Sequence, residues 1–243
     1  MSATIGILGG MGPMATVETF RRITVETRAD TDQEHFHVIV DSDPSVPDRT
    51  RALLEGGQDP RPHLLRSADR LVVAGADVIC MPCNTAHAYY DWLQARVPVP
   101  IVNMIAETVR VASASGPSSF GLLATAGTCR TNVYGSAFSA AGLNLVHPHV
   151  DDQSVVSHGI ARIKAGDLAV RDHFIAVADQ LLAQGATALV LGCTEISLVA
   201  DELARRFPVI DALGVLVAAT LSRARSLTSV ALLQDAEGTS SVA

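Results

Sequence analysis

The chain contains 243 residues, 48% of them hydrophobic and only 4% aromatic, which is enough for one large or two small domains around an aliphatic core. A formal net charge of −7 without a basic block argues against nucleic acid as the main partner. The sequence has no apolar run near the ~18 residues that would indicate a membrane span, and the N-terminus lacks the cationic start of a signal peptide. Four scattered cysteines are too few for a disulfide framework, so we expect a soluble, cytoplasmic protein with reduced thiols.

Short apolar runs alternate with helical patterns along the first half of the chain. Strands are predicted at 4–8, 37–41, 77–81 and 99–102, and helices at 13–28, 61–74 and 85–96. A loop rich in proline and aspartate is predicted between the second strand and Asp59. This βαβ alternation predicts a parallel sheet with helices on both faces.

The same alternation then starts again. Strands are predicted at 120–123, 143–147, 188–191 and 209–210, and helices at 129–141, 154–165, 168–184, 195–207 and 213–226. We expect an α/β protein of two pseudo-symmetric domains, each a mainly parallel sheet flanked by helices, with the active site in the cleft between them. The first domain would comprise residues 1–104 with a C-terminal helix at 211–227, the second residues 105–210, and residues 228–243 would form a flexible tail.

Two cysteines occupy corresponding places in the two halves. Cys83 in MPCNTAHA and Cys193 in LGCTEIS each follow a predicted strand and precede small polar residues and a helix. Open α/β sheets bind ligands at the carboxyl ends of their strands. Two such units facing each other would therefore place both cysteines on one cleft.

The neighbours of these cysteines suit acid–base chemistry. Asn84 or Thr85, and Thr194, are good helix N-caps. A thiol at a helix N-terminus can have a pKa below about 8.5, and the free N–H groups there bind anions such as a carboxylate. Two opposed thiols could invert a carbon next to a carboxylate, because one removes the α-proton and the other returns a proton to the opposite face.

Seven motifs extend this interpretation over nearly the whole chain. They are GILGGMGPMAT (6–16), DQEH (32–35), PDRT (47–50), MPCNTAH (81–87), GLLATAGT (121–128), KAGD (164–167) and GCTE (192–195). With them the sequence resembles the aspartate/glutamate racemase family, and within it the cofactor-independent aspartate racemase branch. The resemblance implies that Cys83 and Cys193 are the catalytic acid–base pair.

The resemblance also implies a set of substrate-binding residues. Those for the α-carboxylate and amino group are Gly10, Met11, Asn84, Thr85 and Thr194, and those for the side-chain carboxylate are Arg49 and Lys164, the only lysine of the chain. Thr128, from the second domain, and Glu195 complete the set. It further implies an acidic amino acid as substrate, aspartate before glutamate, a homodimer, and no pyridoxal phosphate, metal or nucleotide. From the residues alone, Arg49 could instead form a salt bridge in its loop, and Lys164 could be a solvated helix residue.

Three alternative functions remain open at this point. Gly10-x-Gly12-x-x-Ala15 matches a dinucleotide-binding fingerprint, although no acidic residue ends a strand about 20 residues later. A non-catalytic module could bind a small anion in the same cleft. An isomerase of the same architecture could act on another small carboxylate of the maleate or hydantoin type.

Overall fold

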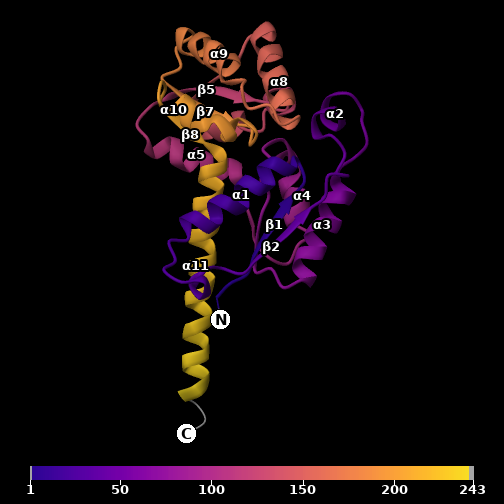
Figure 1. Ribbon diagram of the computed structural model, residues 1–243, viewed down its shortest axis with the longest axis vertical. Coiled ribbons are helices and arrows are strands. Elements are labelled where there is room, and N and C mark those ends of the chain that lie inside the picture. Colours follow the sequence, from indigo (N-terminus) through magenta and orange to yellow (C-terminus); the bar gives the residue numbers. More distant parts are fainter. Residues whose placement is uncertain (1, 241–243) are drawn as a thin grey trace.

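The computed structural model describes residues 2–240, and the side chains of residues 2–230. The chain forms two four-stranded, fully parallel sheets with the orders β2-β1-β3-β4 and β6-β5-β7-β8. The two sheets have the same strand order, with β1, β2, β3 and β4 corresponding to β5, β6, β7 and β8. The predicted pair of pseudo-symmetric α/β units is thereby confirmed (Figure 1).

The first sheet and its helices are built from the first half of the chain. In chain order the elements are β1 (Ile5–Gly9), α1 (Pro13–Glu26), η1 (Asp32–Glu34), β2 (Val38–Ser42), α2 (Arg49–Leu54), α3 (Arg61–Val73), β3 (Val78–Cys80), η2 (Thr85–Tyr89), α4 (Tyr90–Gln94) and β4 (Ile101–Val102). The central strands β1 and β3 are buried along their whole length. Burial on both faces explains their unbroken aliphatic sequences.

The second sheet repeats this arrangement. Its elements are α5 (Met104–Ala114), β5 (Ser119–Ala124), α6 (Ala126–Arg130), α7 (Gly135–Ala140), β6 (Asn144–Val146), α8 (Val150–Lys164), α9 (Arg171–Ala183), β7 (Ala188–Gly192), η3 (Ile196–Val199), α10 (Ala200–Ala204) and β8 (Val209–Asp211). The last helix, α11 (Ala212–Ser240), starts at the second sheet and runs down beside the first (Figure 1). Its buried residues share a core with β1 and β3.

A glycine occurs at corresponding places in the central strands β1 and β5 of the two halves. A Cβ atom on Gly6 of β1 would lie 3.0 Å from the Cβ of Ala76, and one on Gly121 of β5 would lie 2.9 Å from the Cβ of Leu181. At Gly121 a side chain would force its neighbour to shift, and at Gly6 the contact would be tighter than an ordinary Cβ contact. Each glycine thus allows close packing on the central strand of its sheet.

Several predicted helices differ from those observed. The stretches 85–96 and 195–207 each begin with a 3-10 turn before a short α-helix, and 129–141 divides into α6 and α7. Two helices were missed, α2 within the predicted loop and α5 between the sheets. The final helix extends to Ser240 instead of ending near 226, and residues 241–243 of the predicted flexible tail lie outside the described residues. Within residues 2–240 we find no helix with the length and apolar character needed to cross a bilayer.

Candidate active site

Loops at the carboxyl ends of the strands of both sheets enclose a hollow of about 300 Å³, called here the central hollow. It is lined by Met11, Asp48, Arg49, Thr50, Cys83, Asn84, Thr85, Thr125, Lys164, Cys193, Thr194 and Glu195. Both cysteines are therefore brought together, with most of the residues that the sequence predicts as substrate-binding. Of that predicted set, only Gly10 and Thr128 do not line the hollow.

The loop that carries Cys83 is held by a buried histidine. His87 accepts a hydrogen bond at Nε2 from the Met104 N–H (3.1 Å), so its Nδ1 is the nitrogen that donates to the Cys83 carbonyl (2.9 Å). Burial lowers the pKa of His87, which keeps the ring neutral. His87 thus ties the Cys83 loop to the start of α5. It acts on the backbone and not on a substrate.

Cys193 lies directly after β7, and its thiol donates to Glu195 Oε2 (3.1 Å). The other oxygen of Glu195 accepts from the Gly12 N–H (3.1 Å), where α1 begins. Burial and the negative charge of Glu195 raise the pKa of Cys193 well above its usual value, although Lys164 acts in the opposite direction. The prediction of a lowered pKa at this cysteine is therefore wrong, because the thiol is buried and faces a carboxylate instead of a free helix N-terminus.

The expected helix N-caps are also corrected by the structure. Neither Asn84 nor Glu195, which precede η2 and η3, makes a side-chain cap hydrogen bond. Thr194 instead donates its hydroxyl to the Pro82 carbonyl (3.2 Å) and so joins the two cysteine loops.

Asn84, which lines the central hollow, carries a buried donor without a partner among the described residues. Its Oδ1 accepts from the Tyr134 hydroxyl (2.5 Å), and burial raises the pKa of Tyr134, which keeps that hydroxyl protonated. The Nδ2 group of Asn84 is buried and has no hydrogen-bond partner among the described residues. A buried donor without a partner is costly, so a carboxylate oxygen in the hollow would stabilise it.

Three threonine hydroxyls join the two halves of the site. Thr85 contacts Thr125 (2.8 Å) and Thr128 (3.0 Å), and the latter two are 3.1 Å apart. Thr128 is fully buried behind Thr85. It does not line the hollow itself, and its role in substrate binding stays a prediction.

Arg49 and Lys164 each place a cation at the central hollow, one from each half of the chain. The buried Arg49 guanidinium donates to the carbonyls of Val46, Pro47 and Met11, and its Nε has no partner among the residues that the structure describes. In the part of the chain that the structure describes, neither side chain is in a salt bridge. The alternative of a loop salt bridge at Arg49 is thus wrong. Lys164 is exposed at the end of α8 but still borders the hollow.

A second, more open hollow of about 870 Å³ adjoins the first and shares Asp48, Arg49, Lys164 and Glu195 with it. Gly10 borders this adjoining hollow. Its φ of +88° and the Asp43 backbone, 2.3 Å from a Cβ built there, allow only glycine. The adjoining hollow is also lined by apolar side chains from the start of α1 and from the loop after β2, namely Pro13, Met14, Pro44 and Val46.

The structure gives little support to the alternative cofactor sites. The Gly12 N–H, which a dinucleotide fingerprint would offer to a pyrophosphate, is bonded to the Glu195 carboxylate. Among residues 2–230 there is no group of three or more His, Cys, Asp or Glu side chains suited to a metal ion. Cys80 packs in the first core, where burial raises its pKa to about 12.

Some lining residues were missed from the sequence. Thr125 lies inside the GLLATAGT motif, and Asp48 and Thr50 flank Arg49 in PDRT, so their position beside predicted residues was an available signal. Tyr134, which does not line the hollow but contacts Asn84, was not indicated by any such signal, because the two residues are 50 positions apart.

The contact between Glu195 and Cys193 gives a prediction about pH. Glu195→Gln removes the negative charge that helps to raise the pKa of Cys193, so the thiolate should form at lower pH. We expect the pH curve for alkylation of Cys193 by iodoacetamide to move to lower pH, as measured by mass spectrometry of the labelled peptide. The peptide of Cys83 in the same digest is the internal control. An unshifted Cys193 curve would show that Glu195 does not control this thiol.

Comparison with known proteins gives a consistent result. Residues 8–220 match the family model described as Asp/Glu/Hydantoin racemase. The chain is 27% identical to the broad specificity amino-acid racemase RacX of Bacillus subtilis, covering 90% of this chain and 96% of that protein. It is 33% identical to the glutamate racemase of Corynebacterium glutamicum over 59% of this chain and 52% of that one. The structure of Picrophilus torridus aspartate racemase superposes with a TM-score of 0.84 and 32% identity, covering 91% and 94% of the two chains.

Proposed function

Because the chain belongs to the Asp/Glu/hydantoin racemase family and is an amino-acid racemase, we propose that it racemises an acidic amino acid with Cys83 and Cys193 as two opposed acid–base groups. The observation that carries the proposal is the central hollow, in which one cysteine of each half meets one unpaired cation of each half. Two bases from different domains can reach opposite faces of one α-carbon.

In this proposal each turnover removes one proton from the α-carbon of the substrate and adds one proton to the same carbon. The thiolate of one cysteine takes the α-proton, and the electron pair of the broken C–H bond is delocalised into the α-carboxylate. The thiol of the other cysteine then gives its proton to the opposite face. The Asn84 Nδ2 group and nearby hydroxyls are the donors that would stabilise the developing charge on the carboxylate.

Aspartate is the proposed substrate, and glutamate the second choice. Two cations line the central hollow and neither is in a salt bridge with a described residue, which supports a dicarboxylate substrate. The similarity to the aspartate racemase of Picrophilus torridus points in the same direction. The reaction would need neither pyridoxal phosphate nor a metal or nucleotide, since the cysteines supply both proton transfers.

The test is a racemisation assay with the purified, dialysed protein and a panel of L- and D-amino acids. The proposal expects aspartate to be racemised fastest, with no gain from added pyridoxal phosphate. Activity that is lost on dialysis and returns with pyridoxal phosphate would contradict the cofactor-independent mechanism, as would a lack of turnover of any acidic amino acid.

A second candidate is a racemase of wider substrate range. The adjoining hollow favours it, because it opens from the same cations and is partly apolar, which would suit longer side chains. The relative from Bacillus subtilis is itself of broad specificity. In the same assay, this candidate expects neutral amino acids to be turned over at rates comparable to aspartate.

We also propose that the protein is a cytoplasmic homodimer. Helix α1 supports the dimer, since four of its large apolar side chains are exposed: Met14, Val17, Phe20 and Val25. Light scattering at working concentration should give the mass of two chains. A monomer under those conditions would refute the dimer.

A further inference from the structure

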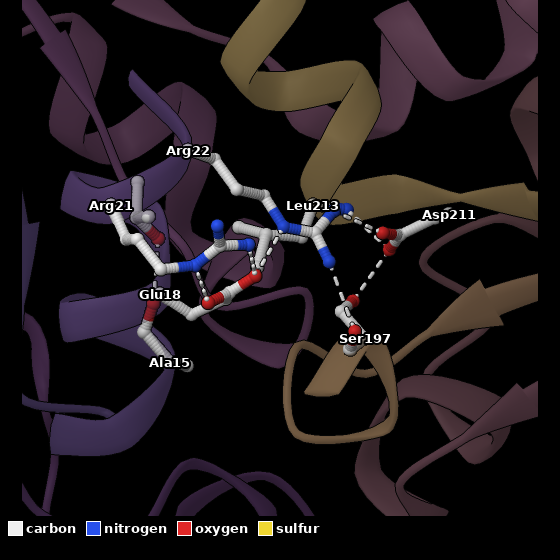
Figure 2. Close-up of polar contacts among 8 residues, drawn as sticks. Ala15, Glu18, Arg21, Arg22, Ser197, Asp211 and Leu213 are labelled. Atoms are coloured by element: carbon white, nitrogen blue, oxygen red, sulfur yellow. Dashed lines mark hydrogen bonds and ion pairs between the residues drawn. The ribbon is translucent and has the colours of Figure 1, made fainter. Parts of the chain in front are cut away.

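Away from the central hollow, one arginine of α1 contacts the other half of the chain (Figure 2). Arg22 donates from Nη1 to Asp211 Oδ2 (2.5 Å), from Nη2 to the Ser197 carbonyl (3.0 Å) and from Nε to Glu18 Oε1 (2.6 Å). The side chains of Arg22 and Asp211 are only 16% and 15% exposed. An ion pair so shielded, with bonds on three sides of the guanidinium, has a well-defined geometry.

The partners of Arg22 lie on both sides of the Cys193 loop. Ser197 is in η3, four residues after Cys193. Asp211 ends β8 and pairs with Leu191 of β7, the strand that leads into Cys193. The other oxygen of Asp211 accepts from the Ser197 hydroxyl (2.5 Å), which closes the cluster. Arg22 therefore holds η3, which follows Cys193, against the end of β8, the strand that pairs with β7.

Helix α1 also contacts this loop at its other end. The Gly12 N–H at the start of α1 donates to Glu195, which accepts from the Cys193 thiol. Gly12 and Arg22 are ten residues apart, or about 15 Å along a helix. One rigid element of the first half thus holds the 193–197 segment of the second half at two separate points.

We propose that Arg22 is a positioning residue for Cys193, because its bonds to Ser197 and Asp211 fix the loop that presents this thiol to the central hollow. The proposal rests on the two-cysteine function. None of the hydrogen-bond partners of Arg22 lines the hollow, so its effect passes through the backbone of η3. Loss of Arg22 should therefore change the environment of Cys193 and leave that of Cys83 unchanged.

The experiment compares Arg22→Met with Arg21→Met. Arg21 is a matched control, since it is the neighbouring arginine, bonds to the same Glu18 and is 60% exposed. For Arg22→Met we expect kcat for aspartate to fall between about 10-fold and about 100-fold with KM within about twofold, because a misplacement of about 1 Å can cost that much. Arg21→Met should remain within about twofold of the wild type.

A second readout does not depend on activity. Iodoacetamide labelling of each cysteine, followed by mass spectrometry, should show a several-fold faster reaction of Cys193 relative to Cys83 in Arg22→Met alone. If that variant does not fold, Asp211→Asn weakens the same ion pair, and its kcat and its ratio of Cys193 to Cys83 labelling are measured instead. A double variant, Arg22→Met with Asp211→Asn, should recover stability without recovering kcat, which separates positioning from folding.

Two results would overturn the proposal. One is a kcat of Arg22→Met equal to that of Arg21→Met, and the other is an unchanged labelling ratio of Cys193 to Cys83. Failure of the two-cysteine function would look different. Cys83→Ser or Cys193→Ser would then retain full racemase activity, whereas the labelling ratio in Arg22→Met would still report whether Arg22 fixes the Cys193 loop.

Discussion

Replacing Cys83 or Cys193 by serine is expected to lower the rate of aspartate racemisation by about 10³-fold or more, which is within the contribution of general acid–base catalysis. Inversion needs a base on one face of the α-carbon and an acid on the other, and the two cysteines come from different halves of the chain. A serine hydroxyl is far too weak an acid to form the required anion near neutral pH. Chiral chromatography of the product measures the rate.

Cys129→Ala is the matched control for this experiment. Cys129 is a partly buried thiol packed in the core of the second half and does not line the central hollow. Its replacement should leave the rate within about threefold of the wild type. A single serine variant at Cys83 or Cys193 with full activity would refute the two-base mechanism.

The second large effect is expected at Arg49. Arg49→Met removes a buried cation from the hollow, and truncating one partner of such a charge pair costs about 3 kcal/mol, or roughly a 100-fold loss of kcat/KM for aspartate. If the guanidinium binds the side-chain carboxylate, the preference for aspartate over asparagine should shrink by a similar factor. Steady-state kinetics with both substrates measures this preference.

Arg51→Met serves as the control for Arg49. It lies on the same helix, is 74% exposed and pairs only loosely with Glu55 (3.5 Å). Because Arg49 also bonds to three carbonyls of its own loops, Arg49→Lys tests whether charge alone suffices. Equal losses for aspartate and asparagine in Arg49→Met would assign the residue to loop structure and not to substrate binding.

Much of the fold could be predicted because its strands are buried on both faces. Runs such as Ile5–Gly9 are aliphatic throughout, and the glycines that admit the covering helices recur in both halves. Helix α5 was missed although Asn103 caps it by accepting from the N–H groups of Ile105 and Ala106, a signal that the sequence carried. Helix α2 has only six residues within a loop rich in proline and aspartate, so its periodicity was too short to detect.

The site could be predicted only as far as its motifs extend. Motifs in each half bring the two cysteines and both cations to one hollow, as expected. The raised pKa of Cys193 could not be foreseen, since it depends first on the burial of the thiol and then on how the Glu195 side chain folds back onto it. The bond between Arg22 and Asp211 joins positions 189 residues apart, and no local pattern indicates such a contact.

The most direct test of the two-base account is proton NMR of L- and D-aspartate in heavy water with the wild type, Cys83→Ser and Cys193→Ser. The wild type should exchange the α-proton of both enantiomers for deuterium. Each variant should retain slow exchange of one enantiomer, through the thiolate that remains, and the two variants should prefer opposite enantiomers. Equal exchange of both enantiomers by either variant would contradict the assignment of one cysteine to each face.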